Sequence, residues 1–132
     1  MRITADTNVL VRAIVADEPQ QARLAQEVLL AADMIAITAP TLCEFVWVLS
    51  RGYGVPFVDI AAAIDTLVAS ANVEVNRPAV EAGLALLREG GDFADGVIAH
   101  EGATLGGVTF ASFDKDAVKR LKALGRDALL LG

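Results

Sequence analysis

The sequence has few of the residues on which many enzymes and binding proteins depend. Aromatic residues make up only 5% of its 132 positions, and it contains one cysteine and one histidine. A single cysteine forms no internal disulfide bond, and a lone histidine without a second histidine or a nearby cysteine makes no zinc site. No uncharged run reaches the roughly eighteen residues of a membrane-spanning helix, and the N-terminus has no signal-peptide pattern. We therefore expect no membrane contact and a cytoplasmic location.

Positive charge is scarce as well. Eleven lysines and arginines stand against seventeen aspartates and glutamates, which gives a formal net charge of −6. This balance argues against indiscriminate binding of polyanions by a broad basic face. It leaves open a metal-dependent nuclease, because acidic residues gathered around divalent cations form, with the metal bound, a locus that attracts phosphate. It equally leaves open a basic protein partner.

Aliphatic residues, in contrast, are abundant. Hydrophobic residues make up 55% of the chain, and the mean hydropathy of +0.51 is high for a soluble monomer. This excess favours an apolar surface that is buried in a homo-oligomer, and we expect a homodimer. The length suits a single domain over residues 1–132.

Short β-like runs alternate with helical patterns along the chain. The strands are predicted at residues 3–5, 34–38, 73–75, 108–113 and 127–131. The helices are predicted at residues 9–16, 19–31, 41–51, 56–70, 77–89, in the segment after Asp92, and from Asp116 to Leu124. This alternation is typical of βαβ units and predicts an α/β fold with a mostly parallel sheet.

Acidic residues follow the first and the fourth predicted strand. Asp6 stands at the carboxyl end of the first strand, and Asp114 ends the strand at residues 108–113 in the same way. In open α/β sheets this edge is where ligands bind. The alternative is plain capping chemistry, in which Asn8 or Thr7 caps the following helix while Asp6 favours the turn.

Glu44 is the one acidic residue in an otherwise almost entirely apolar helix. A lone carboxylate there is costly if it is buried, unless it finds a cation or hydrogen-bond donors. Alternatively, Glu44 marks a narrow solvent-facing stripe together with Thr41 and Arg51. Trp47, in the same helix, is predicted to lie in the core.

Asp92 and Asp95 are three residues apart, so both lie on one side of the first turn of a helix. Capping by Asp92, with Asp95 at the favourable end of the helix dipole, is the structural alternative, but capping needs only one of the two. The last helix carries Lys119, Arg120 and Lys122 toward its end, followed by Arg126. Because cations there suit the helix dipole, we interpret this basic cluster as structural or solvated.

Taken together, these residues resemble a PIN domain, and most closely the VapC-type ribonuclease toxins of toxin-antitoxin pairs. The resemblance spans the chain and rests on Asp6-Thr7-Asn8, Glu44, Asp92-Phe93-Ala94-Asp95 with the following Val97-Ile98-Ala99, and Ser112-Phe113-Asp114. It implies a three-layer α/β/α PIN-like fold with a mostly parallel central sheet. It also implies a metal-dependent endoribonuclease, with RNA as the substrate and a cognate antitoxin protein as the partner.

The resemblance also implies a set of site residues. The four acidic positions of the family, which are catalytic and ligate the metal, fall on Asp6, Glu44, Asp95 and Asp114. Asp92, Asp116, Thr7 and Asn8 are auxiliary candidates, and Arg12 and Arg51 are candidates for contacts with backbone phosphates. A site made of oxygen ligands alone suits the hard cations Mg²⁺ or Mn²⁺.

Two alternatives of other classes remain at this point. A PIN-like scaffold that binds partners without cutting RNA would have a similar sequence. A receiver-like signalling domain also gathers carboxylates at the edge of a parallel sheet, but it needs an aspartate after a middle strand, where this chain has Thr38-Ala39-Pro40.

Overall fold

The computed structural model describes all 132 residues, which separate into two compact units. We call Met1–Asn76 the N-terminal unit and Arg77–Gly132 the C-terminal unit, and describe each by itself. None of the helices in either unit combines the length and the apolar character that are needed to cross a membrane.

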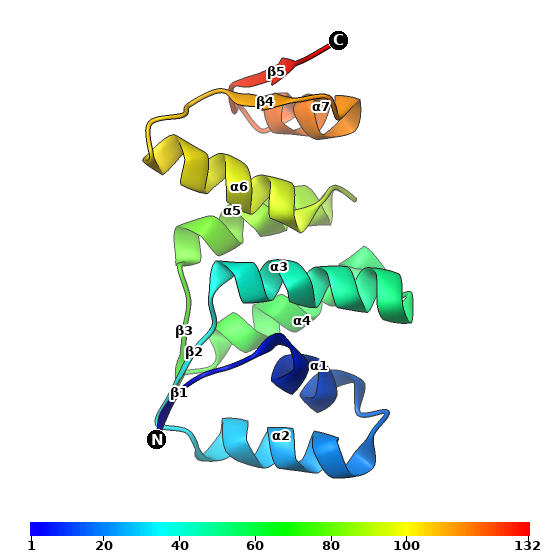
Figure 1. Ribbon diagram of the computed structural model, residues 1–132, viewed down its shortest axis with the longest axis vertical. Coiled ribbons are helices and arrows are strands. Elements are labelled where there is room, and N and C mark those ends of the chain that lie inside the picture. The colour runs from blue at the N-terminus through cyan, green and yellow to red at the C-terminus, as the bar shows by residue number, and fades with distance from the viewer. The chain divides into compact units, whose positions relative to one another are not determined.

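The N-terminal unit is built on a three-stranded parallel sheet in the order β1-β2-β3 (Figure 1). The strands are β1 (Arg2–Thr4), β2 (Met34–Ala36) and β3 (Val73–Glu74). The helices are α1 (Thr7–Val15), α2 (Pro19–Ala31), α3 (Ala39–Trp47) and α4 (Phe57–Ala69), and a π-helical turn, η1 (Val48–Gly52), continues α3. Pro19 and Pro40 stand in the first turns of α2 and α3, where a missing N–H costs nothing.

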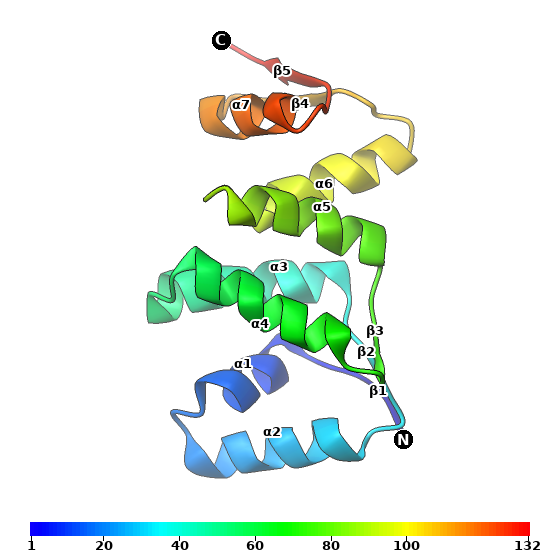
Figure 2. The ribbon, with the colours of Figure 1, turned by 180° about the vertical axis from the view of Figure 1, so that it is seen from behind.

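The C-terminal unit has a two-stranded parallel sheet and three helices. The strands are β4 (Phe110–Ser112) and β5 (Ala128–Leu130), and the helices are α5 (Arg77–Arg88), α6 (Phe93–Thr104) and α7 (Lys115–Ala123). Figure 2 shows α5 beside α6, and α7 against β4 and β5. Phe110 packs on a core cluster formed by Leu86, Ala99 and Leu121.

The strands and helices occur in the predicted order, and every strand pairing is parallel. Most boundaries agree with prediction within one or two residues, and two of the differences have a visible structural cause. The first helix begins two residues earlier, at Thr7, because Asp6 itself is the N-cap. The helix predicted at residues 41–51 begins at Ala39, because Thr38 caps it, and its last turn widens into η1.

Candidate functional site

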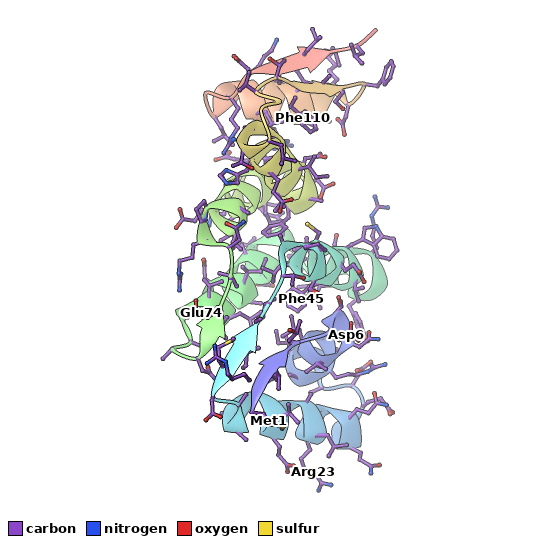
Figure 3. The ribbon with its side chains drawn as sticks, turned by 60° about the vertical axis from the view of Figure 1, so that its left-hand side comes forward. Met1, Asp6, Arg23, Phe45, Glu74 and Phe110 are labelled. Carbon is purple, nitrogen blue, oxygen red and sulfur yellow. The ribbon has the colours of Figure 1, made fainter.

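Asp6 lies where β1 leads into α1, at the carboxyl end of the strand, as predicted. Figure 3 shows it at the end of β1 that is opposite to Met1. Its Oδ1 accepts a hydrogen bond of 2.9 Å from the backbone N–H of Thr7, so Asp6 is the cap of α1. The capping alternative named Asn8 or Thr7 as the cap, but the cap is Asp6. Thr7 is buried behind the cap, with 6% of its surface exposed, whereas Asn8 is exposed.

Thr38 holds the corresponding position after β2. Because Thr4 pairs with Ala36 in parallel register, Asp6 and Thr38 are at the same level beyond the strand ends. The Thr38 hydroxyl caps α3 by accepting from the backbone N–H of Thr41, and it donates to the Thr41 hydroxyl at 3.1 Å. The sequence analysis did not single out Thr38, although a threonine two residues before Pro40 is a helix-start signal.

Glu44 is exposed on α3, so its charge carries no burial cost. This agrees with the solvent-stripe alternative. The prediction that Trp47 lies in the core is wrong, because its exposed fraction is 65%. Residues three apart share one face of a helix, so Trp47 lies on the exposed side that carries Glu44.

Two arginines of the N-terminal unit were candidates for phosphate contacts. Arg12 is engaged within the unit, because its Nη1 donates to Oδ1 of Asp17 at 3.1 Å. The Tyr53 hydroxyl donates to the other oxygen of Asp17, also at 3.1 Å. Arg51, in the last turn of η1, is exposed. Arg51 is therefore the freer of the two cations.

Two carboxylates of the C-terminal unit are helix caps. Oδ1 of Asp92 accepts from the backbone N–H of Ala94 at 3.1 Å at the start of α6. Oδ1 of Asp114 accepts from the backbone N–H of Ala117 at 3.1 Å at the start of α7. The capping alternative for Asp92 thus describes that residue, and Asp114 is a helix cap as well. Asp116, in the first turn of α7, is exposed.

Asp95, in the first turn of α6, is held differently. Burial of its half-buried carboxyl group, together with the nearby negative charges of Asp92 and Asp114, raises the pKa of Asp95 to about 6. The structure provides neither a hydrogen-bond donor nor a cation to this group. Capping does not explain such a carboxylate, because Asp92 already caps the helix. Three carboxylates therefore lie close enough in this unit to repel one another.

A tight crossing of α5 and α6 positions Asp95. The next residue, Gly96, lies so near α5 that a Cβ atom there would come within 2.3 Å of the Ala82 carbonyl oxygen. One turn earlier, the fully buried ring of Phe93 covers Gly83, where a Cβ atom would meet the ring at 2.7 Å. The sequence analysis missed both glycines, although a glycine inside a helical pattern often has a packing reason.

The donor chemistry of Asp92, Asp95 and Asp114 fits a hard divalent cation, because all their ligand atoms are carboxylate oxygens. Burial first, and then the charges of Asp92 and Asp114, raise the pKa of Asp95, and a bound cation would favour its ionised form. Within neither unit do three or more histidine, cysteine, aspartate or glutamate side chains already stand at metal-binding distances. The ligand atoms are thus of the kind that such a cation prefers, but they are not already arranged around a metal site.

Comparison with known families gives one match, to the PIN domain, over residues 3–124. The chain belongs to the PIN domain family. Seven helices and exclusively parallel strand pairing agree with the three-layer α/β/α fold of PIN domains, so the predicted fold class is confirmed. Comparison with curated proteins and with solved structures gives no match.

PIN domains are generally nucleases and typically depend on divalent metals, so the chain has a nuclease-type fold. The family match covers all four acidic positions of the resemblance. It also removes the receiver-like alternative, which belongs to another fold family. Asp6 and Glu44 lie in the N-terminal unit, and Asp95 and Asp114 lie in the C-terminal unit.

Proposed function

We propose that this PIN domain is a Mg²⁺- or Mn²⁺-dependent endoribonuclease and the toxin of a toxin-antitoxin pair. The observation that carries the proposal is the family match over residues 3–124, which spans Asp6, Glu44, Asp95 and Asp114. Asp95 supports it further, because a half-buried carboxylate without a donor has no structural explanation in its own unit. RNA is the proposed substrate, and the cytoplasm the proposed location.

The residues that would hold the metal are Asp6, Asp95, Glu44 and Asp114. A divalent cation supplies an activated water at neutral pH and stabilises charge on the leaving oxygen of a phosphodiester. Asp6 is oriented for this task by its bond to the Thr7 backbone, and Asp114 by its bond to Ala117. Asp95 must lose its proton to act as a ligand.

The remaining candidates have supporting tasks in this proposal. Thr7 is buried next to Asp6 and supports the turn that carries it, while Asn8, Asp92 and Asp116 each lie at the start of their own helix. Arg51 is the better supported phosphate contact, because Arg12 is already paired with Asp17. Such cations position RNA without reading its sequence.

A homodimer and a small antitoxin are the proposed protein partners. Large apolar side chains of the N-terminal unit are exposed along α3, η1 and α4: Trp47, Tyr53, Phe57 and Val58. Exposed apolar surface of this kind supports an interface with protein. A light-scattering mass of two chains, and co-purification of a small protein encoded beside this chain, are the expected results. A mass of one chain at micromolar concentration without any such protein contradicts the proposal.

Cleavage of single-stranded RNA by the purified protein tests the activity. We expect cleavage with Mg²⁺ or Mn²⁺, products with a 5′-phosphate, and no cleavage in excess chelator. Asp6→Asn should abolish cleavage and leave the metal-free melting temperature unchanged or higher, because asparagine also caps helices. Asp59→Asn, at an exposed position in the first turn of α4, is the matched control and should cut normally.

Two outcomes would contradict the proposal. Cleavage that persists in chelator would exclude the metal mechanism. RNA binding without any metal-dependent cleavage, unchanged by Asp6→Asn, would identify the chain as a non-catalytic PIN-like scaffold. Asp6→Ala should be measured beside Asp6→Asn, because it removes the cap as well as the charge and costs about 1 kcal/mol of stability.

A further inference from the structure

The basic residues of α7 and the turn after it are of two kinds. The Arg120 guanidinium donates a hydrogen bond to the carbonyl oxygen of Glu89, in the turn between α5 and α6. The Arg126 guanidinium lies 3.4 Å from Nδ1 of His100 on α6. Both arginines therefore have partners inside the C-terminal unit, and the structural interpretation of the sequence accounts for them.

The lysines are the second kind. The chain contains three lysines, and all of them lie in α7, at Lys115, Lys119 and Lys122. All three side chains are exposed, and none forms a hydrogen bond or an ion pair. Spacings of four and three residues place them within an arc of about 60° on one side of the helix, in a row about 10 Å long. We call this set the lysine row.

Helix electrostatics do not explain the lysine row. Cations stabilise the last turn of a helix, which accounts for Lys122, but Lys115 is the first residue of α7, where the dipole favours negative charge. Lys115 and Lys119 are also like charges four residues apart, an arrangement that destabilises a helix by a few tenths of a kcal/mol. Helix electrostatics therefore account for Lys122 but not for Lys115 and Lys119, which favours a partner outside the chain.

The position of the row identifies the kind of partner. Lys115 directly follows Asp114, so the row begins at the end of α7 that carries a proposed metal ligand. The chain as a whole has a net charge of −6. A row of unpaired ammonium groups is a local positive surface that attracts a polyanion. Ammonium groups on flexible stems bind phosphates as point charges, whatever the bases.

We propose that the lysine row binds successive backbone phosphates of single-stranded RNA and so holds the strand along α7 beside Asp114. The proposal rests on the ribonuclease function proposed above and adds a binding track to it. Because the contacts are with phosphates, the row contributes affinity and no sequence preference. Its contribution must fall with increasing salt concentration, because each neutralised phosphate releases counterions.

The test measures binding of a fluorescent single-stranded RNA to the full chain in chelator, by anisotropy, over a range of KCl concentrations. The variant is Lys119→Gln with Lys122→Gln, and Lys115 is kept because it adjoins Asp114. The control is Arg2→Gln with Arg23→Gln, which removes the same charge from exposed positions of the N-terminal unit. A second variant, Lys119→Arg with Lys122→Arg, keeps the charge.

We expect the lysine-to-glutamine variant to bind RNA more weakly, with unchanged thermal stability. The slope of log Kd against log salt concentration should fall by about 0.7 for each lysine removed. The affinity difference from wild type should thus shrink about sevenfold between about 50 and about 200 mM KCl. The arginine variant should bind as wild type does, and the control should keep the wild-type slope.

The proposal is overturned by an absence of RNA binding by the wild type, by an unchanged salt slope in the lysine-to-glutamine variant, or by an equal loss of slope in the control. Polyglutamate is tested as a competitor beside unlabelled RNA. If polyglutamate displaces the labelled RNA equally well and needs the same lysines, the row binds an acidic polypeptide and the proposal is overturned. Cleavage separates the two proposals. Metal-dependent cleavage with an unchanged KM in the lysine variant refutes the row alone, whereas absence of cleavage by the wild type refutes the ribonuclease.

Discussion

Asp6 and Asp95 are both candidate metal ligands near the start of a helix, yet the chain holds them in opposite ways. Asp6 is exposed, and its carboxylate accepts a hydrogen bond from the backbone N–H of Thr7. Helix capping alone would therefore explain an aspartate at this position, even if no metal bound there. Asp95 is half-buried near the carboxylates of Asp92 and Asp114, and no group donates a hydrogen bond to it. Asp6 therefore has a structural task besides the proposed one, whereas Asp95 has only the proposed one.

Of the three tests that follow, replacing Asp95 should have the largest effect, because the proposed metal site loses a ligand. Asp95→Asn should lower cleavage and Mn²⁺ affinity by about 100-fold or more, since even residues that only support metal ligands are worth 10- to 100-fold. The metal-free protein should be as stable as wild type or more so, because the repulsion is gone. Calorimetric titration with Mn²⁺ and urea unfolding in chelator measure the two quantities. An Asp95→Asn variant that is destabilised and binds Mn²⁺ normally would assign Asp95 a structural task.

The second prediction tests whether the crossing of α5 and α6 positions Asp95, by substituting two glycines of α6. Gly96→Ala should destabilise the fold by about 1–3 kcal/mol, because the new methyl group meets the backbone of Ala82 and Gly83. Gly102→Ala is the matched control, because its nearest contact would be an ordinary 3.8 Å and alanine favours the helix by up to about 1 kcal/mol. Urea denaturation of both variants checks the signs. Equal effects at the two positions would show that the crossing does not hold Asp95.

The smallest expected effect is the pH dependence of stability. It reports on Asp95 because the pKa of this residue is raised. Below its ordinary pKa of 3.8, Asp95 is protonated in the folded and unfolded states alike. Between pH 3.8 and about 6 the unfolded state ionises first, so the metal-free protein loses stability as the pH rises through this window. Solvent screening at a partly exposed group keeps the loss modest.

The measurement is the free energy of unfolding of wild type and Asp95→Asn in chelator, at several pH values from about 4 to about 7. The wild type should fall relative to the variant as the pH rises and run parallel to it above about pH 6.5. Mn²⁺ affinity of the wild type should weaken below about pH 6, because the proton competes for the ligand. A constant difference between the two proteins across the range would contradict the raised pKa.

Much of the fold followed from the sequence because each element has local signals. Alternating periodicity and the prolines and glycines at helix ends placed the strands and helices, so α2 was predicted at its observed bounds and β1 within one residue. The π-helical turn η1 escaped prediction because its residues also suit an α-helix. Trp47 was misplaced because hydrophobicity does not show on which side of an almost uniformly apolar helix solvent lies.

The residues of the candidate site could be predicted from the sequence, but their burial and hydrogen bonds could not. Acidic residues after β1 and β4 could be recognised from their places at strand ends. Which of them caps a helix depends on backbone geometry, so the capping alternative named Asn8 or Thr7 rather than Asp6. Gly96 and Gly83 allow the close approach of α5 and α6 beside Asp95, a contact between two helices that the local sequence does not reveal.

The parallel pairing of all strands has a consequence for when the protein becomes active. Arg2 pairs with Met34, and Phe110 pairs with Ala128, so a helix-containing crossover separates the partners in each case. Neither sheet can begin from a local hairpin, and pairing must wait until these long loops close. Asp6 and Asp114 stand just beyond strands of these sheets, so their settings are completed only when pairing is. In the proposed ribonuclease, Ala128–Leu130 must therefore pair with Phe110–Ser112 before Asp114 reaches its final setting.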